Sequence, residues 1–276
     1  MKPVFIDIDK SPTSIDVIWI GAAITENTSA ILPDHVYGIP CQADAIEEIA
    51  DKYSLKVVYD AAHAFGDEEN GQSILNHGDF SVLSFHATKA YSTLEGGAII
   101  CKTAQMKRKI DEMVNFGFVN GEDVSQVGTN AKMNEVSAAF GLLQLKYMDV
   151  IISSRKAITA VYESAVDQTA GLKLVKTPKG VKGNYSNVPV MVEENSPLSR
   201  DELFRLMEEN GIYCRKYFSP NINQYSVYDN MRYFKPGELP VAESIRQKTL
   251  CLPIYPDLED SDLERITGLL KYQKAG

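Results

Sequence analysis

The sequence predicts an α/β protein in which a domain built on a mostly parallel sheet is followed by a smaller α+β domain. Three observations lead to this prediction. Short β-rich runs alternate with helical stretches over the first hundred residues, and one strand, one helix and one strand follow each other there as a βαβ unit. A long helix with one apolar face then leads into further strands and helices.

The predicted sheet has five strands. They are residues 3–8, 29–38, 56–60, 80–85 and 96–102. Residues 44–53 carry apolar side chains at helical spacing and are predicted as the helix of the βαβ unit. Ligands on parallel sheets bind at the carboxyl ends of the strands. Asp60 and Ser84 lie at or near two such ends, so we expect a site there.

The rest of the chain is divided by a long helix predicted over residues 133–166, which follows a glycine-punctuated loop at 115–130. Its apolar face is formed by Val136, Phe140, Leu143, Tyr147 and Val150. This division predicts a large domain over residues 1–147 and a small domain over 148–276. The small domain is expected to hold a strand at 187–193 and helices at 199–211 and 261–272. Capping boxes are predicted to start these helices, Ser199 with Glu202 and Ser261 with Glu264.

Composition argues against several classes of partner. The net charge is −9 and no dense cluster of lysine and arginine occurs, so neither nucleic acid nor an anionic membrane is an expected partner. The four cysteines form no CxxC pair, which is typical of reduced thiols in a cytoplasmic protein. The four histidines show no metal-ligand spacing, so no metal site is expected.

The segments "AILPDHVYG", "YDAAHAFG" and "SFHATKAYSTLEGG" resemble the core of the DegT/DnrJ/EryC1/StrS aminotransferases. The similarity continues through "GTNAKMNEVSAAFGLLQL" and "LCLPIYPDL". Members of this family are pyridoxal 5'-phosphate (PLP) enzymes that aminate nucleotide-linked keto sugars. The resemblance therefore implies the PLP-dependent fold type I, PLP as cofactor, a nucleotide-sugar substrate, an amino-acid donor such as glutamate, and a homodimer.

Two residues match the catalytic positions of the family. Asp60 matches the acid that keeps the cofactor's ring nitrogen protonated, and Lys89 matches the lysine that forms a Schiff base with the cofactor and moves protons. Taken alone, Asp60 would be interpreted as a helix-capping or turn acid, and Lys89 as a solvated surface charge. A lysine at position 89 also favours transamination, because related sugar dehydratases carry histidine there.

Three more residues match cofactor-binding positions. His63 matches a residue that lies against the ring hydroxyl, and Ser84 matches a serine that binds the phosphate. Asn130 matches a residue that family dimers insert into the neighbouring subunit's phosphate site. The ordinary alternatives are a half-buried histidine bonded to backbone, a strand-end serine and a flexible turn-rich loop.

The family's phosphate cradle and ring-stacking aromatic residue precede the strand that here reads "PVFIDI". The sequence is therefore expected to be truncated at its N-terminus relative to the family, with weaker cofactor binding. A truncated homologue that folds and dimerises without catalysing a reaction is the alternative function.

Substrate specificity is expected to depend on residues 211–230. Many family members carry histidine where this chain has Ile222, and those without it include enzymes that aminate C4 of a dTDP-linked 4-keto-6-deoxy sugar. The predicted product is therefore a 4-amino sugar, with amination at C3 as the alternative. Arg215 and Lys216 could bind the nucleotide phosphates or could be solvated surface cations.

Overall fold

The computed structural model describes residues 2–9, 14–228 and 239–271. Its helices are α1 (Val17–Ala23), α2 (Ala43–Tyr53), α3 (Ala104–Val114), α4 (Glu135–Asp167), α5 (Arg200–Glu209), α6 (Pro240–Lys248) and α7 (Asp260–Leu270). Its strands are β1 (Ala30–Ile31), β2 (Lys56–Asp60), β3 (Glu68–Glu69), β4 (Gln72–Ser73), β5 (Phe80–Ser84), β6 (Gly97–Cys101), β7 (Leu172–Leu174), β8 (Val181–Lys182), β9 (Val188–Val192) and β10 (Thr249–Leu252).

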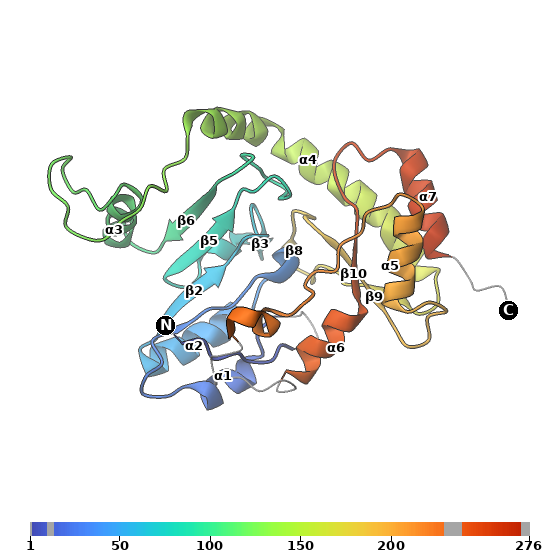
Figure 1. Cartoon of the computed structure of the whole chain (residues 1–276), viewed down its shortest axis with the longest axis horizontal. Coiled ribbons are helices and arrows are strands. Elements are labelled where there is room, and N and C mark those ends of the chain that lie inside the picture. Colours follow the sequence, from blue (N-terminus) through green and yellow to red (C-terminus); the bar gives the residue numbers. More distant parts are fainter. Residues whose placement is uncertain (1, 10–13, 229–238, 272–276) are drawn as a thin grey trace.

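The first sheet has the strand order β1-β2-β5-β6. β1 with β2 and β2 with β5 are parallel, whereas β5 and β6 are antiparallel (Figure 1). α2 connects β1 to β2 and buries Ile46 and Ala50 against Tyr59 and Val57 of the sheet. The predicted βαβ unit is thus formed, and the strands predicted at 56–60, 80–85 and 96–102 correspond to β2, β5 and β6.

The strand predicted over residues 3–8 is wrong. Among the described residues this segment makes a single β-bridge, Ile8 with Ile15, because no described strand lies beside it along its length. Instead, the Asp7 carboxylate accepts hydrogen bonds of 2.9 Å from the backbone N–H groups of Val241 and Ala242. It therefore caps the N-terminus of α6, where a negative charge is favoured by the helix dipole. The strand predicted over 29–38 is shorter than expected, with β1 followed by one bridge.

α4 joins the two halves of the molecule along the top of Figure 1. Asn134 caps it through a bond from the Ser137 N–H of 2.9 Å to its side chain. Met148 packs with the core beside the first sheet, whereas Ile158 and Tyr162 belong to the core of the second sheet. The boundary expected at residue 147 thus falls within this helix. By length and apolar composition α4 could cross a bilayer, but core helices of globular proteins meet the same test.

The N-terminal half of α4 carries an exposed apolar surface. Its members are between 47% and 74% exposed: Val136, Leu142, Leu143, Leu145, Tyr147 and Val150. Four of the five residues predicted as the helix's apolar face belong to this surface, so within the described chain that face is not the buried one. Exposed apolar side chains in this number on one helix segment are typical of an interface.

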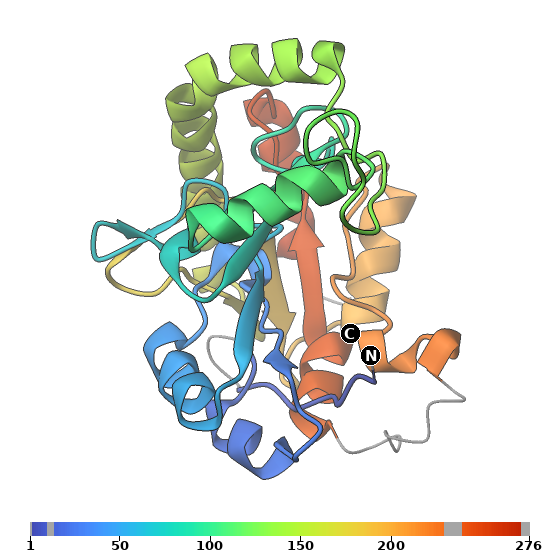
Figure 2. The ribbon, with the colours of Figure 1, turned by 90° about the vertical axis from the view of Figure 1, so that its left-hand side faces the viewer.

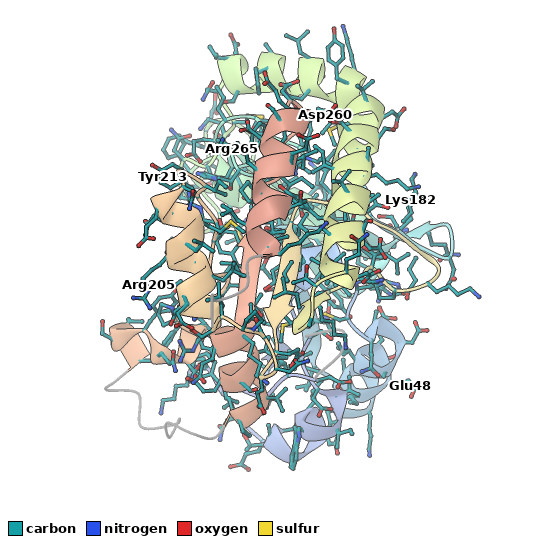
Figure 3. All side chains as sticks on the ribbon, turned by 90° about the vertical axis from the view of Figure 1, so that its right-hand side faces the viewer. Glu48, Lys182, Arg205, Tyr213, Asp260 and Arg265 are labelled. Carbon is teal, nitrogen blue, oxygen red and sulfur yellow. The ribbon has the colours of Figure 1, made fainter. Side chains whose placement is uncertain are left out.

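The second sheet is antiparallel, in the order β10-β9-β7, and is covered by α5, α7 and the end of α4 (Figures 1 and 2). The predicted strand at 187–193 is β9. Ser199 and Glu202 form the predicted capping box of α5. The capping box predicted at Ser261 is wrong: the N-cap of α7 is Glu259, two residues earlier, and Asp260 lies in the first turn of the helix (Figure 3). Residue 272, predicted as helical, and residues 229 and 230 of the substrate segment lie outside the described residues.

Asp67 is fully buried, and neither of its side-chain oxygens has a hydrogen-bond partner among the described residues. Gly38 lies against it with φ +82°, and a Cβ at this glycine would collide with the carboxyl group. Burial raises the pKa of Asp67 well above 3.8, an effect opposed by the nearby Asn184 backbone. The carboxyl group is therefore held in its neutral form in the folded chain.

We predict that Asp67 makes the folded chain less stable as pH rises. A carboxyl group with a raised folded-state pKa contributes its full stability below the unfolded value and loses it as pH rises toward the folded value. The free energy of unfolding should fall by about 1.4 kcal/mol per pH unit over that window. Chemical denaturation of the parent and of Asp67→Asn measures this, and the decline should be shallower in the variant by about 1.4 kcal/mol per pH unit. The exposed Asp51→Asn is the control; equal pH slopes in the parent and Asp67→Asn would contradict the prediction.

Candidate active site

The candidate site lies where the parallel strands β2 and β5 end. Asp60 is the last residue of β2 and Ser84 the last of β5, and Asp60 pairs in register with Val82. Lys89 follows β5 in a turn closed by a 2.9 Å bond from its N–H to the His86 carbonyl. Parallel strands thus bring these residues, far apart in the sequence, to one edge of the sheet.

Asp60 accepts a 3.0 Å hydrogen bond at Oδ1 from the Ala62 N–H. This bond is the one expected of a turn acid, and it holds the carboxylate at the start of a short turn closed by a 2.9 Å bond from the Ala64 N–H to the Ala61 carbonyl. Within the described part of the chain, Oδ2 makes no hydrogen bond. One oxygen is therefore free to bind a cationic group.

His63 is buried and points into the same region. Its Nδ1 accepts a 3.2 Å hydrogen bond from the Tyr37 N–H, so the neutral ring carries its proton on Nε2. Burial, and then the charge of Lys89, lower the pKa of His63 to about 4. The ring is therefore a neutral donor, and among the described residues no acceptor bonds its Nε2.

The backbone of His63 is fixed by a polar segment that leads into β9. The buried Asn184 side chain donates hydrogen bonds to the carbonyl groups of His63 (2.7 Å) and Phe65 (3.0 Å). The amide oxygen of Asn184 in turn accepts the Ser186 N–H at 2.8 Å. The buried Arg155 of α4 donates to the carbonyl of Tyr185 at 3.2 Å. No local sequence pattern predicts this support, because Asn184 and His63 lie far apart in the chain.

Lys89 is half-buried and has no ion-pair partner in the described part of the chain. Burial lowers the pKa of its ammonium group, while the charges of Asp60 and then Asp34 oppose the shift. A lysine in such a setting loses its proton more easily than a surface lysine. This environment is the one that a nucleophilic amine requires.

Asp34 also belongs to the site, and it was not among the predicted site residues. It forms a parallel β-bridge with Asp60, and burial, then the charge of Asp60, raise the pKa of Asp34 to about 8. An acid inside the predicted apolar strand "AILPDHVYG" was the available signal. Its position beside Asp60 depends on strand register, which the sequence alone did not give.

Ser84 and Asn130, the predicted phosphate ligands, are not brought together. Ser84 is half-buried, and its Oγ accepts a 3.3 Å bond from the His86 N–H. Asn130 is exposed and lies on the segment that projects beyond α3 (Figure 1), where it accepts a 2.7 Å bond from Lys132 Nζ. Within one chain, the structure therefore groups Asp60, His63, Ser84 and Lys89, without Asn130.

The predicted substrate segment reaches the site through aromatic contacts. The Tyr37 hydroxyl donates a 2.6 Å hydrogen bond to the Tyr217 carbonyl, and the Phe218 ring stacks with His63 at a centroid distance of 5.9 Å. Arg215 is exposed. Lys216, in contrast, is bonded to Asp201 at 2.6 Å and lies over the Phe204 ring, so it is not a free cation.

Residues 1–271 match the DegT/DnrJ/EryC1/StrS aminotransferase family. The chain belongs to this family, which confirms the resemblance seen in the sequence. Over 272 residues it is 46% identical to a dTDP-4-amino-4,6-dideoxy-D-glucose transaminase of Shigella dysenteriae, covering 98% of this chain and 73% of that protein. An Escherichia coli protein of the same name is 41% identical over 271 residues, with the same coverage.

Solved structures give the same assignment. DesI, crystallised in the presence of its TDP-sugar product, superposes with a TM-score of 0.91 at 33% identity, covering 98% of this chain and 68% of DesI. DesV of S. venezuelae, in complex with a ketimine intermediate, gives 0.89 at 28% identity, covering 98% and 71%. The predicted fold class, PLP-dependent fold type I, is confirmed. The chain spans about seven-tenths of the length of these relatives.

Proposed function

We propose that this chain is a PLP-dependent aminotransferase of the cytoplasm that transfers an amino group, with glutamate as donor, to a nucleotide-linked 4-keto-6-deoxy sugar. The convergence of Asp60, His63 and Lys89 at the ends of β2 and β5 carries the proposal. The names of the Shigella and Escherichia coli relatives support a dTDP-linked sugar aminated at C4. All four cysteines are free thiols, which supports a reducing compartment.

The side chains of Asp60, His63 and Lys89 are chemically suited to bind the ring and the aldehyde group of PLP. The ring nitrogen needs an anion, the ring hydroxyl a donor, and the aldehyde an amine. Asp60 offers one free carboxylate oxygen, His63 offers the Nε2 proton, and Lys89 offers an unpaired amine with a lowered pKa. Ser84 offers its hydroxyl to the phosphate. When bound, the cofactor supplies an electron sink that stabilises negative charge on the carbon being deprotonated.

Lys89 holds the cofactor and then moves protons at Nζ. With PLP bound and the donor amine in place of the lysine, the free Nζ amine would take the proton from the α-carbon of the donor and would later give it back. The second half-reaction runs these proton transfers in reverse with the keto sugar. The partly buried setting keeps this amine neutral at lower pH than a solvated lysine would be.

Asp60 and His63 keep the ring in one electronic state and one position. The Asp60 carboxylate stabilises a proton on the ring nitrogen, which strengthens electron withdrawal. The neutral His63 donates to the ring hydroxyl and, because Asn184 fixes its backbone, keeps its orientation. The sugar enters from the side of Tyr217 and Phe218, where Arg215 is available for the nucleotide phosphates.

We predict that Lys89→Ala abolishes amino transfer. The parent chain, loaded with PLP and given ¹⁵N-glutamate and dTDP-4-keto-6-deoxyglucose, should yield a ¹⁵N-labelled amino sugar at C4, read by mass spectrometry and NMR. Loss of the general base should reduce the rate by about 100-fold or more. Lys102→Ala changes an exposed lysine at the opposite end of the same sheet, is the control variant and should keep the parent rate.

The outcomes separate the candidate functions. A ¹⁵N label at C3 would mean that the chain is an aminotransferase that acts at C3 and not at C4 of the sugar. No label with any keto sugar, in a folded chain that still binds PLP, would contradict the proposed enzyme and leave the non-catalytic homologue. An active Lys89→Ala variant would contradict the assigned role of this lysine.

We also propose that the chain acts as a homodimer in which Asn130 of one subunit binds the cofactor phosphate of the other. The exposed apolar surface of α4 and the projecting segment that carries Asn130 lie next to each other in sequence and support this arrangement. It also explains why the segment 115–130, which ends at Asn130, projects away from the first sheet, whose strands β2 and β5 carry Asp60 and Ser84 (Figure 1).

Mixing two inactive variants tests the shared site. Lys89→Ala and Asn130→Asp chains, unfolded and refolded together, should form hybrid dimers with one intact site and regain activity that neither variant has alone. Size-exclusion chromatography with light scattering measures the mass. A monomer with full activity, or no recovery on mixing when hybrids are present, would contradict the proposal.

A further inference from the structure

Asp34 lies directly opposite Asp60 on the neighbouring strand. The pairing of β1 with β2 continues past Ile31: the Asp60 N–H donates to the Pro33 carbonyl at 2.8 Å, and the His35 N–H donates to the Asp60 carbonyl at 2.9 Å. Residues opposite each other in a ladder project their side chains to the same face of the sheet. Two carboxyl groups therefore face the site side by side.

The carboxyl group of Asp34 makes no hydrogen bond with any described residue, although it is partly buried. A capping or turn acid normally bonds a nearby backbone N–H, as Asp60 does through Ala62. Asp34 makes no such bond among the described residues, so helix capping or turn formation does not account for an acid at this position. Within the described ranges, the side-chain hydrogen bond that reaches Asp34 is made to its backbone: the Cys41 thiol donates to the Asp34 carbonyl at 3.1 Å.

The titratable groups that face Asp34 come from three parts of the fold. They are Asp60 of β2, Lys89 after β5, and Tyr37 and Cys41 on its own segment. Burial keeps Tyr37 and Cys41 neutral by raising the pKa of both groups. The charges that remain are those of Lys89 and the two acids, and two adjacent carboxylates resist ionising together.

We propose that Asp34 is a positioning residue that acts through Asp60: its protonated carboxyl group leaves Asp60 as the single carboxylate opposite Lys89 and the cofactor ring. This role rests on the proposed function. When Asp34 ionises, a second negative charge is added beside Lys89. That charge favours the protonated form of the lysine nitrogen, so a smaller fraction of Lys89 is present as the neutral amine that can take a proton. Asp34 thereby sets the alkaline limit of the reaction.

The cofactor-free chain gives the first test, which does not depend on activity. With ¹³C-labelled aspartate, one carboxyl resonance should titrate near pH 8 and disappear in Asp34→Asn. In Asp60→Asn the same resonance should titrate at lower pH, by about one pH unit, because a neighbouring negative charge is removed. Asp79→Asn, at the opposite end of β2, should leave it unchanged. An Asp34 resonance that titrates near 4 and ignores Asp60→Asn would overturn the proposal.

The loaded enzyme gives the second test. The visible band of the lysine-bound cofactor should show an alkaline ionisation in the parent that Asp34→Asn lacks, and the rate of the variant should hold to higher pH. A change in melting temperature with an unchanged pH profile would show a purely structural role and overturn the proposal. If the parent shows no visible band, the proposed function is refuted. The ¹³C titration of the cofactor-free chain would still test whether the charge of Asp60 acts on Asp34.

Discussion

Parallel pairing of β2 with its two neighbours determines where the chemistry of this chain can occur. β1 and its extension bring Asp34 beside Asp60, and β5 brings Ser84 and then Lys89 to the same edge. α2 makes this pairing possible because it returns the chain to the start of β2 and covers the sheet with Ile46 and Ala50. A shift of the strand register by one residue would place the Asp60 side chain on the opposite face of the sheet and remove the site.

Partial burial of this edge gives the site its protonation pattern. His63 is neutral and bears its proton on Nε2, Asp34 holds a proton, and Lys89 gives up its proton more readily than a surface lysine. All three shifts have burial as their largest cause, and they leave Asp60 as the anion that faces the cationic groups. The Asn184 bonds then tie this arrangement to the second sheet. The protonation states and the positions of these residues at the strand ends therefore support the same roles for Asp60, His63 and Lys89.

The sequence predicted what depends on local pattern and missed what depends on distant pairing. β2 and β5 were predicted correctly because their β-rich sequences form strands when a neighbouring strand is present. The capping box of Ser199 with Glu202 was predicted correctly because it depends only on residues three positions apart. Residues 3–8 have the same composition, but no described strand lies beside them, so they form no strand. Asp34 and Asn184 were missed because their partners lie far away in the chain.

The central claim is that Asp60, His63 and Lys89 form a PLP site in this chain, and covalent trapping tests it most directly. PLP is added to the purified chain, the visible absorbance is recorded, and borohydride then fixes any lysine-bound cofactor for peptide mapping. We predict a visible band and a single modified peptide that contains Lys89, both absent in Lys89→Ala. Absence of the band at saturating cofactor, or modification spread over surface lysines, would contradict the account.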